Sequence, residues 1–365
     1  MKKSLAVRVL ERALLIQQIP APTYEEGERA AYVRSEFELE GLSDITQDEI
    51  GNVYARIPGG NSEKCVVVSA HLDTVFPRDT DLKVKAAKEK IRAPGLGDNS
   101  IGLAGLFGLL WGIREEKISL AGDIWLVANV GEEGLGDLRG MRAVVDRFEA
   151  VPAAYIVLEG FGLGRVFVRG LGVRRFRIHA RTQGGHSWAN YGMPSAIHEI
   201  AKLITELAKI KLPADPKTTL NVGMICGGTS VNSIAANASI EVDLRSEDQK
   251  ALEQLVGKVL KLVNSKQHKD LAYEVEPIGS RPYGEISESH PLVQTAKKVL
   301  GQLGLVPELI IGSTDANIPL NLGFPAICIG ITTGGYPHSK DEFIHTKPIA
   351  KGMRQLIDIV RLTLA

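Results

Sequence analysis

The pattern of hydrophobic and polar positions along the chain predicts both strands and helices. Continuous apolar, β-branched runs bounded by glycine, proline or charge indicate buried strands at residues 65–70, 124–130, 154–158 and 326–331. Helical patterns lie between these runs, in the stretch after Asn99 and at residues 138–148 and 292–303. Apolar strands that alternate with helices are typical of a largely parallel sheet with helices on both faces. We therefore expect an α/β domain.

The middle of the chain shows a different pattern. The predicted order is strand, helix, strand, strand, helix, strand, at residues 173–181, 194–211, 219–226, 239–245, 247–266 and 271–278. This βαββαβ order is that of a ferredoxin-like α+β fold, and alternation in the first strand indicates a sheet covered on one face. We predict that this domain, residues 171–284, is inserted into an α/β domain formed by residues 1–170 and 285–365.

Charge and cysteine content limit the expected partners. Lys plus Arg equals Asp plus Glu at 43 each, so no global charge favours nucleic acid or a membrane surface. The longest uncharged apolar run, residues 101–113, is shorter than the ~20 residues that span a bilayer and is predicted to be a buried helix. No secretory signal is expected, because charged residues interrupt the N-terminal apolar pattern. The three widely spaced cysteines disfavour disulfides and thiolate metal sites, so we expect a cytoplasmic protein.

Imidazole and carboxylate groups follow several predicted strands at the point where each strand ends. His71 follows the first strand, Glu132 and Glu133 follow the second, and Glu159 follows the third. Asp98 precedes the glycine-rich helix. Ligands of open α/β sheets collect at the carboxyl ends of the strands, so these groups are expected to lie together.

Each of these residues has a plain structural explanation when it is taken alone. A histidine after a strand is usually structural, a Glu-Glu pair is usually on the surface, and an Asp-Asn pair before a helix is usually a cap. Together, however, several carboxylates at one sheet edge would repel one another unless a cation neutralised them. Oxygen and imidazole donors suit zinc, with cobalt or manganese as substitutes, and their number fits two ions. Asp73 shares a face with His71 and is expected to orient its imidazole.

The motifs, in their order along the chain, resemble those of the M20 metallopeptidase family. They are His71-Leu72-Asp73-Thr74, Gly97-Asp98-Asn99, Gly131-Glu132-Glu133-Gly134, Leu158-Glu159-Gly160, Gly184-Gly185-His186-Ser187 and a late His345. The family includes glutamate carboxypeptidase, peptidase T, acetylornithine deacetylase and succinyl-diaminopimelate desuccinylase. The resemblance spans nearly the whole chain, including the inserted domain.

This resemblance implies a role for each residue of the motifs. Asp98 would bridge two metal ions, Glu133 and His345 would complete one metal site, and His71 and Glu159 would complete the other. Glu132 would act as the general base, taking a proton from a metal-bridging water that attacks the amide carbonyl. The resemblance also implies a cis peptide bond between Asp98 and Asn99. His338 is expected to lie near His345 without binding metal.

The resemblance further implies that the inserted domain is a lid that forms a homodimer. His186 would reach the partner's active site and stabilise an oxyanion, whereas the same motif could simply form a turn. Asn232 and Arg245 match the residues that bind a substrate carboxylate, although Arg245 could equally be a salt-bridged residue at a strand end. Thr314 matches a substrate-binding loop, for which a plain turn is the alternative.

The leading functional hypothesis is metal-dependent hydrolysis of an amide bond in a small peptide or N-acyl amino acid with a free carboxylate. Relatives with carboxypeptidase or deacylase activity tend to carry Glu at the position of Glu159, which favours this hypothesis. The alternatives are a di- or tripeptide aminopeptidase resembling peptidase T, and a catalytically silent metal-binding scaffold. Glu132 argues against the scaffold, because a silent site needs no carboxylate beside the metal ligands.

Overall fold

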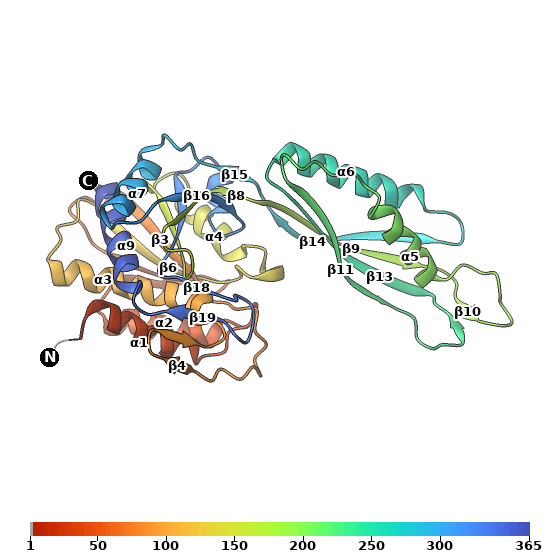
Figure 1. Ribbon diagram of the computed structural model, residues 1–365, viewed down its shortest axis with the longest axis horizontal. Helices are drawn as coiled ribbons and strands as arrows, with labels where there is room; N and C mark the ends of the chain where they lie inside the picture. The colour runs from red at the N-terminus through yellow and green to blue at the C-terminus, as the bar shows by residue number, and fades with distance from the viewer. Residues whose placement is uncertain (1–2) are drawn as a thin grey trace. The chain divides into compact units, whose positions relative to one another are not determined.

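The structure is a computed structural model that describes residues 3–365. It divides into two compact units (Figure 1). Unit 1 comprises the chain up to Gly170 together with Gly284–Ala365, and unit 2 comprises Leu171–Tyr283. The second boundary lies one residue before the predicted one.

The sheet of unit 1 has a parallel centre and antiparallel edges. The centre consists of β6 (Asp123–Asn129), β3 (Cys65–His71), β7 (Tyr155–Glu159) and β17 (Ala326–Gly330), in that order. These are the four strands predicted from the apolar runs. The edges are β2 (Val53–Ile57) and β1 (Ser43–Gln47) on one side, and β8 (Arg165–Gly170), β15 (Gly284–Glu285) and β16 (Glu308–Gly312) on the other. The edge pairs are antiparallel except β8 with β16.

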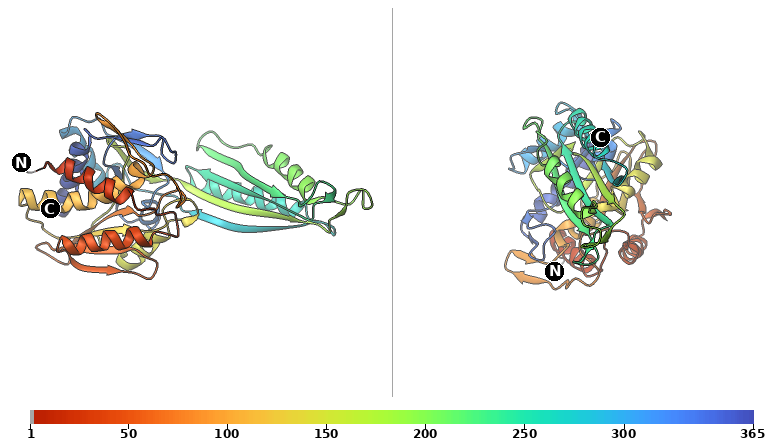
Figure 2. Two further views of the ribbon diagram at one scale, coloured as in Figure 1. Left: turned by 90° about the horizontal axis from the view of Figure 1, so that it is seen from below. Right: turned by 90° about the vertical axis from the view of Figure 1, so that its right-hand side faces the viewer.

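Helices cover both faces of this sheet, as predicted (Figure 2). One face packs against α1 (Leu5–Gln17), α2 (Gly27–Leu39), α3 (Ile101–Glu116), α7 (Pro291–Gln302) and α9 (Ile349–Leu364). The other face packs against α4 (Arg139–Phe148) and α8 (Asn317–Asn321). Neighbouring residues of β3 point to opposite faces: Val66 and Val68 belong to the first core and Val67 to the second.

The apolar segment around α3 is part of the protein core. Residues Leu96–Glu116 are long and apolar enough to cross a membrane, but 94% of the most apolar window is buried inside the structure. The prediction of a buried helix is therefore confirmed. No other helix within residues 3–365 meets the same criteria of length and composition.

Unit 2 has the predicted βαββαβ order. Its elements are β9 (Gly172–Arg181), α5 (Ala196–Leu207), β11 (Thr218–Gly227), β13 (Asn237–Ser246), α6 (Gln249–Ser265) and β14 (Ala272–Arg281). The strands form an antiparallel sheet in the order β11-β13-β9-β14. Both helices pack on one face, where Phe176, Ile178 and Ala180 of β9 lie in the core. Two short strands, β10 (Gly185–His186) and β12 (Ser233–Ile234), pair with each other.

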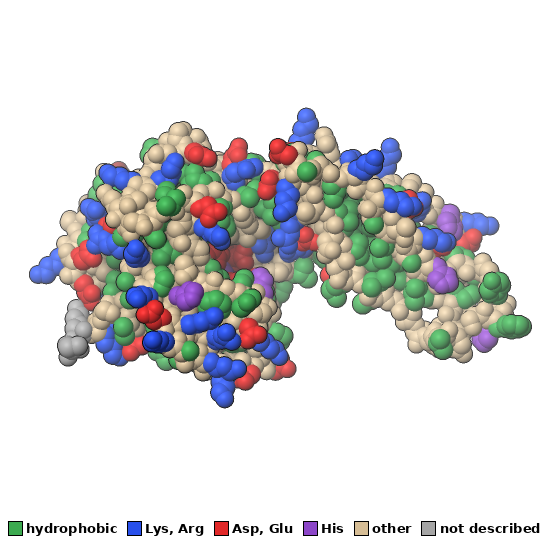
Figure 3. Space-filling model, in the orientation of Figure 1, with side chains coloured by type: hydrophobic (Ala, Val, Ile, Leu, Met, Phe, Trp, Pro, Cys, Tyr) green, Lys and Arg blue, Asp and Glu red, His purple; other side chains and the backbone are tan. Residues whose placement is uncertain are grey.

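The open face of this sheet carries rows of ion pairs. Its Arg–carboxylate pairs are Arg175–Asp243 at 2.9 Å, Arg177–Glu241 at 2.8 Å and Arg181–Glu274 at 2.9 Å. Basic and acidic side chains are also interspersed over the molecular face shown in Figure 3. Charges on the open sheet face are thus matched by neighbours of opposite sign.

Candidate metal centre

The sheet of unit 1 brings the predicted residues to its carboxyl edge. His71 ends β3 and Glu159 ends β7, while Glu133 follows the end of β6. Asp98 lies in the turn before α3, and its peptide bond to Asn99 is cis, as the resemblance implies. This turn lies directly against the end of β7, because a Cβ on Gly160 would be only 1.7 Å from the carbonyl oxygen of Gly97.

Asp98 stands at the centre of the cluster, with one carboxylate oxygen on each side. Its Oδ1 lies 3.1 Å from Nε2 of His71, and the same nitrogen lies 3.7 Å from Oε2 of Glu159. On the other side, Oδ2 of Asp98 lies 3.1 Å from Nε2 of His338, which is also 3.1 Å from Oε1 of Glu133. The carboxylate therefore joins two sets of donors, each with one histidine and one glutamate.

The structure corrects the prediction for the late histidine. His338, not His345, lies beside Asp98 and Glu133. His345 belongs to β19 (Phe343–His345), where its backbone N–H donates to the carbonyl of Thr333 and its Nδ1 lies 3.0 Å from the Thr333 hydroxyl. His338 precedes this strand in a turn and has a φ of +61°, which turns its side chain toward the carboxylates. Its place in a Pro-His-Ser turn was the available signal, because turns and loops often carry binding residues.

Asp73 holds both the histidine and the paired glutamates. Its carbonyl oxygen lies 3.0 Å from Nδ1 of His71, which leaves Nε2 of that ring directed at Asp98. Its two carboxylate oxygens accept hydrogen bonds from the backbone N–H groups of Glu132 and Glu133, each at 2.9 Å. Thr23 donates its hydroxyl to the same carboxylate at 2.8 Å. Asp73 therefore orients three residues, namely His71, Glu132 and Glu133.

The pKa values of the cluster show how unfavourable its charges are without a cation. Burial, assisted by neighbouring carboxylates, raises the pKa of Glu133 and of Glu159 to about 7. Contacts with Asp98 and Glu133 raise the pKa of His338 to about 10. Burial lowers the pKa of His71, but the carboxylates of Asp73, Asp98 and Glu159 outweigh this effect and raise it well above the usual value. The raised pKa values of both histidines and both glutamates thus have one cause, an excess of buried carboxylates that favours positive charge at this site.

The donor set fits divalent metal ions. Ligand atoms of His71, Asp98 and Glu133 all lie within 4.8 Å of one another. Nε2 of His71 is buried, and its polar neighbours are the carboxylates of Asp98 and Glu159. Imidazole nitrogen and carboxylate oxygen are suitable ligands for zinc, and a carboxylate with one donor set on each side suits a pair of ions.

Comparison with known proteins identifies the family. The family model for peptidase family M20/M25/M40 matches residues 67–362. The chain belongs to this family. The protein is therefore an M20 peptidase, which is a hydrolase. The family membership that its sequence motifs predict is confirmed.

Three proteins match this M20 peptidase over nearly the full length of both chains. Protein YqjE of Bacillus subtilis strain 168 is 26% identical over 372 residues, which cover 97% of each chain. A tripeptidase from Staphylococcus aureus has a similar structure, with a TM-score of 0.82, 23% identity and 98% of each chain covered. YXEP of Bacillus subtilis, described as a dinuclear metal-binding peptidase, has a TM-score of 0.71 at 15% identity, covering 100% of this chain and 99% of that one. The two structural similarities establish the shared fold.

In unit 2 of this M20 peptidase, His186 is exposed and its ring orientation is defined. Its backbone N–H donates to Oδ1 of Asn190 at 2.9 Å. Its Nδ1 accepts from the backbone N–H groups of Trp188 and Ala189, at 3.2 and 3.3 Å. Because Nδ1 is an acceptor, Nε2 carries the ring proton in the neutral form and can donate it to an external oxygen.

Asn232 and Arg245 lie at opposite ends of unit 2. The carbonyl of Asn232 accepts from the N–H of Ser187, so Asn232 lies beside the His186 segment. Asn232 comes shortly before Asn237, the residue that begins β13, whereas Arg245 lies near the other end of this strand. Asn237 and Arg245 are eight residues, or roughly 26 Å, apart. Arg245 is paired with Asp243 at 2.6 Å, and its side chain is 40% exposed. The structure therefore does not bring Asn232 and Arg245 of one chain together around a single carboxylate.

Thr314 is buried in the turn that begins α8. Its hydroxyl accepts from the N–H of Ala316 at 3.2 Å, and its own N–H donates to Oδ1 of Asn317 at 3.0 Å. These contacts match the plain-turn alternative. The neighbouring Asp315 is fully buried and accepts from Asn129 at 2.7 Å, while burial and the charge of Glu132 raise its pKa well above the usual value.

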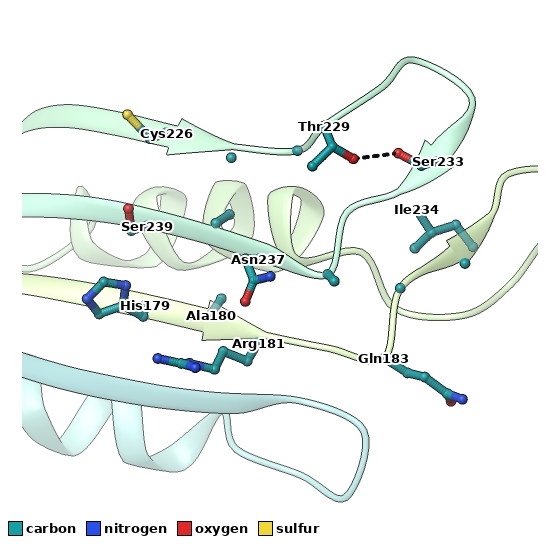
Figure 4. Close-up of a pocket in the computed structure, with 16 residues that line it drawn as sticks. His179, Ala180, Arg181, Gln183, Cys226, Thr229, Ser233, Ile234, Asn237 and Ser239 are labelled. Atoms are coloured by element: carbon teal, nitrogen blue, oxygen red, sulfur yellow. Dashed lines mark hydrogen bonds between the residues drawn. The ribbon is translucent and has the colours of Figure 1, made fainter.

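A separate cavity of about 500 Å³ lies in unit 2 at the ends of β9, β11 and β13 (Figure 4). His179 and Cys226 line it, but they stand on strands either side of β13 and both pair with Ser239. Their backbones are thus two strand spacings, roughly 9–10 Å, apart. This cavity does not assemble a metal site comparable to the cluster in unit 1.

Proposed function

We propose that this M20 peptidase uses two zinc ions to hydrolyse an amide bond in a small peptide or N-acyl amino acid that has a free carboxylate. The observation that carries this proposal is the position of Asp98 between two donor sets, with Glu132 next to one of the donors in the chain. Cobalt or manganese could substitute for zinc at such oxygen and nitrogen donors.

Each donor set would hold one ion. His71, Glu159 and one oxygen of Asp98 form the first set, and His338, Glu133 and the other oxygen of Asp98 form the second. When bound, such ions polarise a carbonyl oxygen and lower the pKa of water. The protein's part is to hold the donors at fixed positions, which Asp73 does for His71 and for the glutamate pair.

Glu132 is assigned the role of general base. It is only 5% exposed, and its backbone is held by Asp73. Its carboxylate would accept a proton from the attacking water and deliver that proton to the departing amine.

Unit 2 supplies the remaining proposed substrate contacts. His186 presents a ring N–H that could stabilise the oxyanion, and the partly exposed Arg245 offers a guanidinium suited to a carboxylate. Asn232 lies with His186, at the end of unit 2 opposite Arg245. This separation supports a homodimer through unit 2, in which the two ends would serve different active sites.

The test is a panel of dipeptides and N-acyl amino acids, each also prepared with a blocked N-terminus or an amidated C-terminus. The purified protein is incubated with Zn²⁺, Co²⁺ or Mn²⁺, with chelated protein as control. We expect metal-dependent cleavage of N-blocked substrates and none of the C-amidated ones. A requirement for a free amine would instead show an aminopeptidase, and no cleavage by the metal-loaded dimer would show a silent scaffold.

A further inference from the structure

Glu342 is a buried acidic residue that belongs to neither donor set. It lies four residues after His338, directly before β19, and its side chain is fully buried. Its backbone N–H donates to the carbonyl of Ser339, and its own carbonyl accepts from the N–H of Ala93. The residue therefore belongs to the same turn as His338 and is anchored to the segment that leads to Asp98.

The carboxylate of Glu342 reaches the backbone of that segment. Its Oε1 accepts from the N–H of Gly97 at 2.7 Å and from the N–H of Asp98 at 3.1 Å. Gly97 and Asp98 are about 245 residues away in the sequence, so these bonds join distant parts of the chain. Buried N–H groups that lose such an acceptor carry a desolvation penalty.

We propose that Glu342 is a positioning residue that fixes the distance between Asp98 and His338, and so sets the geometry of the second donor set. This inference rests on the proposed function, because it concerns how that metal centre is held. Asp98 and His338 come from separate segments, and the two Oε1 hydrogen bonds place the Asp98 backbone against the turn that carries His338. Partners of this kind typically change metal affinity or activity by about 10–100-fold when they are removed.

Three substitutions vary the acceptor at this position and its reach. Glu342→Ala removes the acceptor and leaves the N–H groups of Gly97 and Asp98 unpaired. Glu342→Gln keeps an acceptor oxygen of the same reach. Glu342→Asp keeps the carboxyl group on a side chain one methylene shorter, which cannot reach both N–H groups without movement of the backbone. Asp341→Asn is the matched control, because this neighbour is 78% exposed and its nearest ion-pair partner is Arg92 at 3.8 Å.

The experiment titrates chelated protein with Zn²⁺ and Co²⁺ by calorimetry and measures bound metal per chain. We expect Glu342→Ala to weaken binding of one ion at least about tenfold, with a smaller loss for Glu342→Gln and none for Asp341→Asn. Substrate kinetics should show a lower kcat with little change in KM. Wild-type affinity in Glu342→Ala, or an equal loss in Glu342→Gln, would overturn the proposal.

If Glu342→Ala does not fold by circular dichroism, Glu342→Asp decides the question. A folded Glu342→Asp protein with weakened binding of one ion supports the proposal, and one with wild-type binding of both ions overturns it. The titration also keeps the two proposals apart. A wild-type protein that binds two ions but cleaves no amide would contradict the proposed function, while the effect of Glu342 on metal affinity would still be decided.

Discussion

The metal centre of unit 1 and the open sheet face of unit 2 are built from similar residues but balance their charges differently. On the sheet face, Arg177 lies 2.8 Å from Glu241 and 3.2 Å from Glu276, and both of its ion pairs are partly exposed to solvent. In unit 1, Glu133 and Glu159 are near other carboxylates, and their pKa values are raised to about 7 by burial and these neighbouring charges. On the sheet face the basic and acidic side chains balance one another, whereas the carboxylates in unit 1 require protonation or a cation.

This difference shows that the density of charge alone does not mark a functional site. Unit 2 has many charged residues along one face, yet exposed pairs of this kind contribute little free energy and place no group in an unusual ionisation state. The unit 1 cluster has fewer charges, but their imbalance and burial perturb several pKa values together. Substitutions in the two regions should therefore differ in their effects on activity, metal binding and stability.

Replacing Glu132 by Gln should have the largest effect on activity. The amide cannot accept the proton that the proposed mechanism assigns to Glu132, so kcat should fall by about 10²–10⁴-fold. Bound metal per chain should stay at the wild-type value. Both quantities are measured on the same preparation, by substrate kinetics and elemental analysis.

The same chemical change in unit 2 provides the control. Glu241→Gln removes one carboxylate from the open sheet face, where it pairs with Arg177. We expect kcat to remain close to that of the wild type. A Glu132→Gln enzyme with normal turnover, or a Glu241→Gln enzyme as impaired as Glu132→Gln, would contradict the distinction drawn between the two regions.

The two late histidines should differ in their effect on metal binding. His338→Ala removes a nitrogen that lies 3.1 Å from both Asp98 and Glu133, so bound metal should fall from two ions toward one per chain. His345→Ala removes a ring whose Nδ1 contacts Thr333, so bound metal should remain unchanged. Equilibrium dialysis against Zn²⁺ measures both. Loss of metal in His345→Ala alone would restore the original prediction for that residue.

The case of the two histidines shows what the sequence can and cannot predict. His71 and Glu159 each lie at the end of an apolar run, so the parallel sheet places them at one edge once the strands are recognised. The choice between His338 and His345 depends on the direction of each side chain. That direction is set by the positive φ of His338 and by the pairing of β19, and neither can be read from local composition.

Burial also decides which strands can be predicted from the sequence. The central strands β3, β6, β7 and β17 were predicted because burial on both faces gives them continuous apolar sequences. Edge strands such as β1 were not predicted, because their half-exposed residues resemble those of loops. Glu342 was missed for another reason: its hydrogen-bond partners are about 245 residues away, and nothing near it in the sequence indicates them.

The stability of the metal-free protein should fall as pH rises, unlike that of the metal-loaded protein. The pKa of Glu133 and of Glu159 is raised from 4.5 to about 7 in the folded state, and that of His338 is raised from 6.5 to about 10. A raised pKa contributes stability that is fully present below the unfolded value and is lost as pH rises through the folded value. These groups therefore destabilise the metal-free fold progressively from about pH 5 upward.

Metal ions reverse this trend, because they bind the deprotonated ligands and stabilise the folded state by mass action. Thermal unfolding of chelated and Zn²⁺-loaded protein between about pH 5.5 and 8 tests the prediction. The difference in Tm between the two forms should widen with pH, by roughly 2 °C or more over this range. A difference that stays constant or narrows would show that the cluster is not neutralised by metal.

The smallest effect is expected from Glu276→Gln on the open face of unit 2. Glu276 lies 3.2 Å from Arg177 and 3.4 Å from His179, and 48% of its side chain is exposed. Solvent screens these pairs, and Arg177 retains Glu241 as a partner, so the free energy of unfolding should change by less than about 1 kcal/mol. Denaturant unfolding and a Zn²⁺ titration measure the two relevant quantities. A larger loss of stability, or any change in metal affinity, would mean that this face is coupled to the metal centre and that the two regions cannot be treated as electrostatically independent.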